Sequence, residues 1–217
     1  MNQAEEDYLK LIYELHGEFD EPFIKSSDLA EKFGYTIQSV NEMIKRMDRK
    51  GLLKFQPYKG VRLTEKGEAE ALRMIRAHRI WEVFLSEKLG LSWEALHDEA
   101  EKLEHATSPL VLQRLYEYLG HPEYCNHGNP IPDADGNMKK EALVALHDAE
   151  ASKQFRILRV MDHKPLLKYL NQLSLSLNDL VKIVEKDSFG GIVKIKKDDT
   201  FHHLSKNVAS MIFGEYE

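Results

Sequence analysis

The pattern over residues 25–64 constrains the fold of this chain more than any other feature. The run Ser26–Asp28 predicts the cap of a helix over Leu29–Phe33, and a second helix is expected from its cap Thr36 to its stop Gly51. The turn between the two helices is short and contains a glycine, which is typical of a helix-turn-helix. The second helix is predicted to bury Ile37, Val40, Ile44 and Met47.

A short hairpin is predicted directly after the second helix. Leu53–Gln56 and Val61–Leu63 have strand-like residues on either side of a turn at Pro57–Gly60. Thr64 is predicted to cap the helix that comes next. A helix-turn-helix followed by such a hairpin indicates a winged helix.

The charge of this region differs from the charge of the whole chain. The 217 residues carry a formal net charge of −6, whereas residues 41–66 hold eight Lys or Arg and three Asp or Glu, a local net charge of +5. Because local charge governs contact with a polyanion, the overall acidity does not exclude DNA binding. The excess acid lies at the N-terminus and around residues 94–104, where cations are expected to bind.

The rest of the N-terminal half is predicted to be helical. An amphipathic helix over residues 4–17 is expected to end at Gly17, and further helices cover residues 65–89, 93–104 and 108–119. The last three helices carry more apolar surface than one small bundle buries. This surplus predicts a dimer interface.

The sequence pattern changes after residue 120. Proline, glycine, Asn and Asp are frequent in residues 121–140, which predicts an ordered turn and a linker. The remaining residues predict a small β-barrel with one short helix over Pro165–Leu173. Strands are expected at Phe155–Met161, Leu180–Glu185, Gly191–Ile195 and Val208–Phe213, with turns at Ser188–Gly191 and Lys197–Thr200.

The composition argues against a membrane-spanning protein and against a secreted, disulfide-bonded protein. The chain is 42% hydrophobic and 30% charged, as in ordinary globular proteins. It has no apolar run near the roughly 20 residues of a membrane span, and an acidic, helix-like start indicates no secretory signal. The single cysteine, Cys125, excludes an internal disulfide and fits a reducing compartment. We therefore expect a cytoplasmic protein with no membrane partner.

One predicted helix collects acids and histidines on a single face. Its members, spaced i, i+4, i+7 and i+8, are His97, Glu101, Glu104 and His105. His78 and Glu82, again four residues apart, precede them on the long helix. Carboxylate and imidazole donors from neighbouring helices are typical ligands of a divalent metal. The alternative interpretation is a solvated acidic helix face with no ligand.

These motifs together resemble the diphtheria toxin repressor and manganese transport regulator family of metal-dependent repressors, and the resemblance covers nearly the whole chain. The ending Glu101-x-x-Glu104-His105 is highly specific, and the turn Cys125-x-His127-Gly128 resembles the three-domain manganese sensors of the family. The segments that carry the resemblance are Glu6–Lys10, Ile12–Glu14, Lys59–Gly67, His78–Arg79, Glu82–Leu85, His97–His105, Cys125–Gly128 and Ile131–Pro132.

The resemblance implies a mainly α protein with a small β domain. The expected parts are a winged helix-turn-helix DNA-binding domain over residues 1–72, a helical dimerisation and metal-binding domain over 73–140, and an SH3-like (FeoA-like) domain over 141–217. The implied function is a Mn²⁺-dependent repressor, a homodimer on palindromic double-stranded operator DNA that controls metal-uptake genes. An iron-dependent repressor of the same family is the alternative.

The resemblance also assigns metal ligands. Asp7, Glu101, Glu104 and His105 match the primary regulatory site of the family, and their oxygen and imidazole donors suit Mn²⁺. The iron-responsive branch carries thioether and thiol ligands where Asp7 and Glu101 stand. We therefore expect Mn²⁺ as the cofactor, Fe²⁺ as its competitor, and Zn²⁺, Co²⁺ or Cd²⁺ as substitutes in vitro.

A second metal site is implied for the three-domain manganese sensors. It would consist of Glu82, Cys125, His127 and Asp162, whereas taken alone Cys125 and His127 are an ordinary loop pair and a buried cysteine is usually inert packing. His78 and His97 match ligands of an ancillary site in the iron-responsive relatives. Two core histidines that bind no metal are the alternative.

The second helix of the helix-turn-helix is expected to read DNA. Its outward residues would contact base edges, and basic residues on the helix and the hairpin would hold phosphates. At Gln38, Asn41 and Glu42 the chain departs from the family pattern, which leaves the operator sequence open. A winged helix used for protein contact is the alternative. The expected DNA-binding residues are Thr36, Gln38, Ser39, Asn41, Glu42, Lys45, Arg46, Lys59 and Arg62.

Two other function classes are open to a protein with such residues. A metal site rich in Glu and His can activate water, but no nucleophile stands beside a matched base and no glycine-rich phosphate loop is present, so we expect no enzyme. A repressor that senses a small organic ligand would need a deep apolar pocket, and the polar ligand set argues against it.

Overall fold

The computed structural model describes residues 1–19, 23–187 and 191–217. Its contacts divide the chain into two compact units. The first unit contains residues 1–78, 103–107 and 132–137, and the second unit contains residues 79–102, 108–131 and 138–217. No helix among the described residues is long and apolar enough to cross a membrane.

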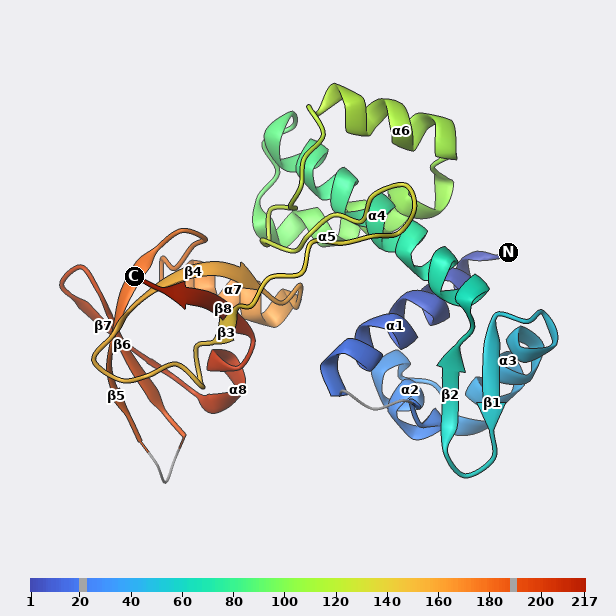
Figure 1. The fold of residues 1–217 in the computed structure, drawn as a ribbon, viewed down its shortest axis with the longest axis horizontal. Helices are drawn as coiled ribbons and strands as arrows, with labels where there is room; N and C mark the ends of the chain where they lie inside the picture. Colours follow the sequence, from blue (N-terminus) through green and yellow to red (C-terminus); the bar gives the residue numbers. More distant parts are fainter. Residues whose placement is uncertain (20–22, 188–190) are drawn as a thin grey trace. The chain divides into compact units, whose positions relative to one another are not determined.

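The first unit contains a winged helix. In Figure 1 the helices α1, α2 and α3 lie beside the hairpin of β1 and β2, and apolar residues of these elements form one buried core. The strands pair in the register Leu53↔Leu63 to Gln56↔Gly60, as the sequence predicts for a wing. The elements are α1 (Gln3–Phe19), α2 (Ser26–Phe33), α3 (Ile37–Arg49), β1 (Leu53–Gln56) and β2 (Gly60–Leu63).

Several local predictions about this unit are confirmed. Thr36 caps α3, since its hydroxyl accepts a hydrogen bond from the Ser39 amide. Thr64 in the same way accepts from the Gly67 amide at the start of the next helix, 3.1 Å away. Gly60 has φ +123°, and a Cβ there would collide with the Ile24 carbonyl, so the wing requires glycine at this position.

Two predictions about helix ends and one about burial are wrong. Gly17 does not end α1, which continues to Phe19, because a helix tolerates a glycine at a cost of about 1 kcal/mol. Ser26–Asp28 do not cap α2 but lie inside it, and Lys25 is the extended cap residue. The Ser27 hydroxyl donates to the Asp28 carboxylate. Ile37 is 54% exposed, because it stands in the first turn of α3 and faces away from the core.

Three further helices follow the wing. They are α4 (Glu65–Glu87), α5 (Trp93–Ala106) and α6 (Pro109–Tyr118), within two residues of the predicted ends. Ser108 caps α6, because its hydroxyl accepts from the Val111 amide. Apolar side chains of α6 remain exposed, notably Leu110, Val111 and Tyr118. The predicted surplus of apolar surface is therefore present on α6.

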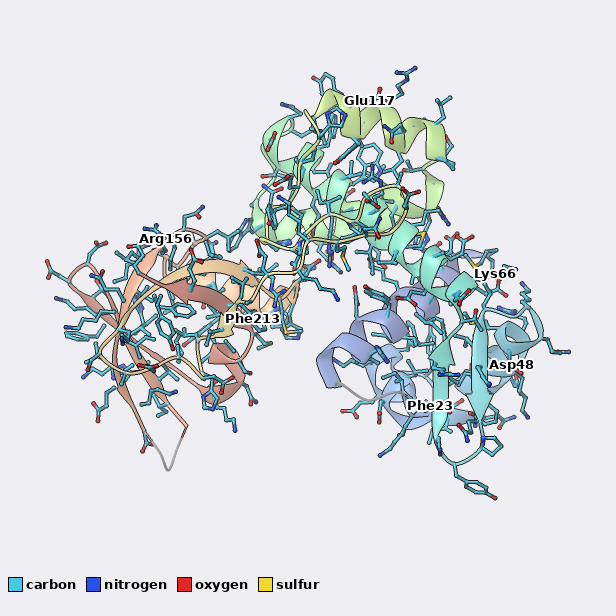
Figure 2. All side chains as sticks on the ribbon, in the orientation of Figure 1. Phe23, Asp48, Lys66, Glu117, Arg156 and Phe213 are labelled. Atoms are coloured by element: carbon cyan, nitrogen blue, oxygen red, sulfur yellow. The ribbon has the colours of Figure 1, made fainter. Side chains whose placement is uncertain are left out.

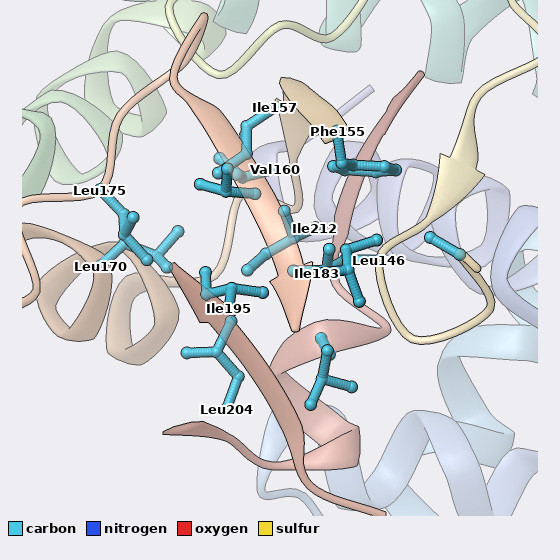
Figure 3. Close-up of a cluster of buried hydrophobic side chains, with 14 of the residues drawn as sticks. Leu146, Phe155, Ile157, Val160, Leu170, Leu175, Ile183, Ile195, Leu204 and Ile212 are labelled. Atoms are coloured by element: carbon cyan, nitrogen blue, oxygen red, sulfur yellow. The ribbon is translucent and has the colours of Figure 1, made fainter. Parts of the chain in front are cut away.

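The C-terminal part of the second unit is an antiparallel sheet. In the described residues its six strands follow the order β3-β8-β4-β5-β6-β7. Figure 3 shows the buried core that they share with a short helix, with Phe155, Ile183, Ile195 and Ile212 among its members. The elements are β3 (Val144–Ala145), β4 (Gln154–Val160), α7 (Lys164–Gln172), β5 (Leu180–Lys186), β6 (Val193–Lys197), β7 (Thr200–Leu204), α8 (Lys206–Ala209) and β8 (Ile212–Tyr216).

The expected strands β4, β5 and β6 and the helix α7 are confirmed with ends shifted by one or two residues. The expected strand Val208–Phe213 is wrong in its first half, because Ser205 caps α8 and β8 begins only at Ile212. The strands β3 and β7 were not predicted. The turn at Lys197–Thr200 connects β6 to β7. The expected turn at Ser188–Gly191 lies outside the described residues except for Gly191.

Candidate metal centres and DNA interface

Asp7, Glu104 and His105 converge in the first unit, and we refer to them as the Asp7 cluster. Asp7 lies on α1, and the other two lie at the end of α5. Asp7 Oδ1 is 2.9 Å from His105 Nε2, and Glu104 Oε1 is 3.6 Å from the same nitrogen. Each residue offers a donor atom, and these atoms lie within 4.8 Å of one another. The Glu104 side chain is fully buried.

A third carboxylate, that of Glu6, lies beside the imidazole of His105. Glu6 Oε2 lies 2.7 Å from His105 Nδ1, and Arg73 donates to Glu6 at 3.0 Å. An ionised carboxylate only accepts hydrogen bonds, so Glu6 fixes a proton on Nδ1 of His105. Nε2 faces Asp7 and Glu104 and is the ring nitrogen that could bind a metal, as in metal sites where a carboxylate orients the ligating histidine.

Lys10 and His78 lie on the other side of Glu104. Lys10 Nζ is 3.0 Å and 2.9 Å from the two Glu104 oxygens and 3.1 Å from His78 Nδ1. His78 Nδ1 also makes a hydrogen bond with Glu104 Oε2. His78 and Lys10 are both buried. Sequence reasoning found neither Lys10 nor Glu6, although each is within three residues of Asp7 on α1.

Glu101, the fourth residue expected with Asp7, stands one turn before His105 on α5. Its side chain is 36% exposed, and its Oε2 is 4.0 Å from His97 Nε2. His97 Nδ1 in turn lies 3.1 Å from Asp162 Oδ2. The structure therefore connects His97 with Glu101 and Asp162, and His78 with Glu104.

Glu82, Cys125, His127 and Asp162 meet in the second unit, and we refer to them as the Cys125 cluster. His127 Nδ1 is 3.0 Å from Glu82 Oε1 and 3.9 Å from Asp162 Oδ1. Cys125, Glu82 and His127 are buried and offer donor atoms within 4.8 Å of one another. Burial raises the pKa of the Cys125 thiol well above its usual range, and the nearby Glu82 charge raises it further.

A tight turn presents Cys125 and His127. The Gly128 amide donates to the Cys125 carbonyl, and the Val160 amide donates to the His127 carbonyl, both at 2.9 Å. Gly128 has φ +76°, and a Cβ at this position would collide with the Leu158 carbonyl on β4. The turn can lie this close to β4 only because residue 128 is a glycine.

Both clusters fit a divalent metal by the chemistry of their donors. The Asp7 cluster offers carboxylate oxygens and one imidazole nitrogen, which suit a hard or borderline cation such as Mn²⁺ or Fe²⁺. The Cys125 cluster adds a thiol, which becomes a ligand as its thiolate. In each cluster a histidine lies beside a carboxylate, and a metal ion would supply the charge that such a buried group of acids lacks.

The expected DNA-reading residues lie on α3 and on the wing. Five of them are exposed on α3, whereas Asn41 and Arg46 are half-buried. Lys59 and Arg62 on the wing are exposed, and their cationic groups lie 5.9 Å and 5.5 Å from the centre of the Phe23 ring, which Figure 2 labels. The exposed residues on α3 are Thr36, Gln38, Ser39, Glu42 and Lys45.

Arg46 has a partner that sequence reasoning missed. Glu5, on α1, is completely buried, and its Oε1 lies 3.0 Å from Arg46 Nε and 2.7 Å from Lys50 Nζ. Burial works against the charge of Glu5, but its contacts with Lys50 and Arg46 outweigh burial and lower its pKa. This carboxylate therefore connects α1 to α3 and to its C-cap residue Lys50.

Three family matches together cover most of the chain. Residues 1–61 match the family described as "Iron dependent repressor, N-terminal DNA binding domain". Residues 64–133 match "Iron dependent repressor, metal binding and dimerisation domain", and residues 144–216 match the FeoA domain.

Individual relatives agree with these matches. The chain is 33% identical over 190 residues to the iron-dependent repressor IdeR of Mycobacterium leprae, which covers 87% of this chain and 79% of that protein. The structure of the manganese regulator SloR is similar with a TM-score of 0.85 and 36% identity over 98% of each chain. A manganese-dependent transcriptional repressor in complex with manganese is similar with a TM-score of 0.88 and 30% identity, covering 98% of this chain and 100% of that one.

Fold, domain matches and relatives thus agree on one family and on a function that is not enzymatic. The chain belongs to the iron-dependent repressor (diphtheria toxin repressor) family of metal-dependent transcriptional repressors, with its DNA-binding, metal-binding and dimerisation, and FeoA domains.

Proposed function

We propose that this chain is a Mn²⁺-dependent repressor that binds a palindromic operator as a homodimer and controls metal-uptake genes. The observation that carries the proposal is the convergence of hard donors in the Asp7 cluster, with Asp7 Oδ1 2.9 Å from His105 Nε2. Carboxylate oxygens are the donors that suit Mn²⁺, and the single imidazole adds one borderline donor to them. The proposed ligands are Asp7, Glu101, Glu104 and His105.

Fe²⁺ is the alternative activating metal. The IdeR relative is named for iron, and Fe²⁺ accepts the same oxygen and nitrogen donors. Asp7 and Glu101 are carboxylates, however, where the iron-responsive branch has softer sulfur ligands. This difference favours Mn²⁺ over Fe²⁺, with Zn²⁺, Co²⁺ and Cd²⁺ as substitutes in vitro.

The proposed mechanism depends on which elements carry the ligands. Asp7 stands on α1, which packs in the core of the winged helix, whereas Glu104 and His105 stand on α5. Bound Mn²⁺ would supply positive charge between acids that repel one another without it. Asp7 and His105 would then hold α1 to the end of α5, and Glu5 would carry this restraint to α3 through Arg46 and Lys50.

The DNA contacts belong to α3 and the wing. We propose that Gln38, Ser39, Asn41 and Glu42 read base edges in the major groove, where the N-terminal part of a recognition helix lies. Lys45, Arg46, Lys59 and Arg62 would hold phosphates, with Thr36 at the N-terminus of the helix. Two such helices in a dimer would fit half-sites about one turn of DNA apart.

The Cys125 cluster is proposed as a second metal site. Metal held by Glu82, Cys125, His127 and Asp162 would join the turn at Cys125 to the C-terminal end of β4. His97 is a proposed auxiliary group because it lies 3.1 Å from Asp162. We propose domain boundaries at 1–72, 73–140 and 141–217, and a cytoplasmic location, where operator DNA is present.

The choice of metal can be tested by selecting operators and then titrating metals. Random palindromic DNA is selected with purified protein in an equimolar mixture of Mn²⁺, Fe²⁺, Co²⁺ and Zn²⁺ without oxygen. Binding of the selected operator is then titrated with each metal alone. We expect half-maximal binding at a lower free concentration of Mn²⁺ than of Fe²⁺. A response to Fe²⁺ at tenfold lower concentration would support the iron-dependent alternative.

A further inference from the structure

The turn between the two strands of the wing carries an aromatic residue in a conformation that suits glycine. Tyr58 has φ +66°, and its side chain is fully exposed. The Lys59 amide donates to the Gln56 carbonyl at 3.1 Å, which closes a turn with Pro57 second and Tyr58 third. Proline at the second position and a positive φ at the third are the pattern of a type II turn, whose third residue is normally Gly or Asn.

The conformation of Tyr58 costs free energy that no contact within the chain offsets. A bulky side chain is strained at positive φ, and a fully exposed ring packs against nothing that would compensate for the strain. Residues that keep such strain are concentrated at functional sites. The other described non-glycine residues with positive φ have an imidazole or a short polar side chain, and they are His121, Ser152, Ser174, Asn178 and Asp198.

The hairpin that presents Tyr58 is basic. Residues 50–64 hold four Lys or Arg and no Asp or Glu. The cationic groups of Lys59 and Arg62 lie 5.9 Å and 5.5 Å from the centre of the Phe23 ring, so both charges gather at one aromatic side chain. An exposed phenol next to Lys59 in the chain therefore stands in a surface whose charge is complementary to a polyanion.

We propose that Tyr58 contacts the sugar-phosphate backbone of operator DNA. Its hydroxyl donates to a phosphate oxygen and its ring packs against a deoxyribose, next to the phosphates held by Lys59 and Arg62. Neither contact reads a base, so Tyr58 adds affinity without sequence preference. The strain of the turn is then offset only in the complex with DNA. This inference rests on the proposed function, because it takes the wing as part of the DNA interface.

Three variants separate DNA contact from the stability of the turn. Tyr58→Asn removes the ring and places at positive φ a residue that tolerates this conformation. Tyr58→Phe keeps the ring and removes only the hydroxyl. Phe201→Asn is the matched control, because Phe201 is a half-exposed aromatic residue on β7 of the barrel, outside the winged helix.

Operator affinity is measured by fluorescence anisotropy at saturating Mn²⁺ with three different selected operators, and stability is measured by urea denaturation. We expect operator binding to weaken about tenfold in Tyr58→Asn and roughly threefold in Tyr58→Phe, with the same factor on each operator. Phe201→Asn should bind as the parent does. The urea midpoint of Tyr58→Asn should equal or exceed that of the parent, because asparagine relieves the strain.

Equal operator affinity in Tyr58→Asn and the parent would overturn the inference and leave the proposed function standing. A loss that differs among the three operators would also overturn it, since Tyr58 would then read bases. So would a lower urea midpoint or failure to fold in Tyr58→Asn, which would show that the tyrosine stabilises the folded chain. A parent that binds no selected operator with Mn²⁺ would contradict the proposed function, and the inference with it.

Discussion

At the scale of single residues, adjacent side chains on α1 have different partners. Glu5 pairs with Arg46 and Lys50, Glu6 holds His105, and Asp7 faces the other nitrogen of His105. A helix turns about 100° per residue, so three successive acids point in three directions. Of these, only Asp7 is a proposed ligand of the metal.

Asp7→Met is expected to shift metal selectivity toward Fe²⁺, because a thioether replaces a hard oxygen donor. Operator binding is titrated with Mn²⁺ and with Fe²⁺ for the parent and the variant, and the ratio of the two half-maximal concentrations is compared. Asp199→Met is the matched control, since Asp199 is fully exposed in the barrel. Identical ratios in the parent and Asp7→Met would show that Asp7 does not set selectivity.

Cys125→Ser is expected to lower the number of metal ions bound per chain and to leave the Asp7 cluster filled. A neutral hydroxyl is a weaker donor than a thiolate, so the turn at Cys125 should lose its metal link to Asp162 after β4. Hydrogen exchange across residues 150–217 should become faster, and operator affinity at saturating Mn²⁺ should fall only in part. If neither the number of metal ions per chain nor hydrogen exchange changes, Cys125 is a buried packing residue and not a metal ligand.

At the scale of elements, α1 contacts both the proposed metal ligands at the end of α5 and the helix α3, which is proposed to read DNA. Glu5→Gln removes the charge that pairs with Arg46 and Lys50, both of which are partly exposed. We expect unfolding of the first unit to cost about 1–2 kcal/mol less, since solvent screens the two partners. Urea denaturation checks this value. Glu31→Gln, an exposed change on α2, should shift stability by less than about 0.5 kcal/mol.

Sequence patterns predicted the elements better than their contacts. The caps Thr36 and Thr64 are local signals, and the structure confirms their roles. The strand β3 has only two residues, and in β7 the buried positions hold His202 and Leu204 while Phe201 is exposed, so the apolar residues of neither strand mark its buried face. Short strands depend on pairing with distant partners, which the sequence of the strand itself does not encode.

The residues of the candidate site also form two groups: those that the sequence indicates and those that only the structure reveals. The spacing of Glu101, Glu104 and His105 on one helix is visible in the sequence, and resemblance to the family added Asp7 and the Cys125 cluster. Lys10 meets Glu104 across 94 positions of sequence, and Glu6 meets His105 across 99. No periodicity links residues so far apart, so these partners required the structure.

At the scale of the whole molecule, the exposed apolar side chains of α6 predict dimerisation without metal. Sedimentation of the metal-free protein at micromolar concentration should give a dimer. The apolar contacts that Leu110, Val111 and Tyr118 would make between two chains do not depend on a metal ion. Leu110→Asp should weaken the dimer, whereas Ile192→Asp, a similar change in the barrel, should not. A metal-free monomer that dimerises only with Mn²⁺ would replace this prediction with metal-driven association.

Metal at the Asp7 cluster is proposed to control DNA binding. The most direct measurement is the affinity for the selected operator, by fluorescence anisotropy, of the parent and Asp7→Ala, each with Mn²⁺ and with chelator. We predict at least about tenfold tighter binding by the parent with Mn²⁺ than with chelator, which is about 1.4 kcal/mol of coupling. Asp7→Ala should bind weakly in both conditions. Equal affinity of the parent with and without metal would contradict the account.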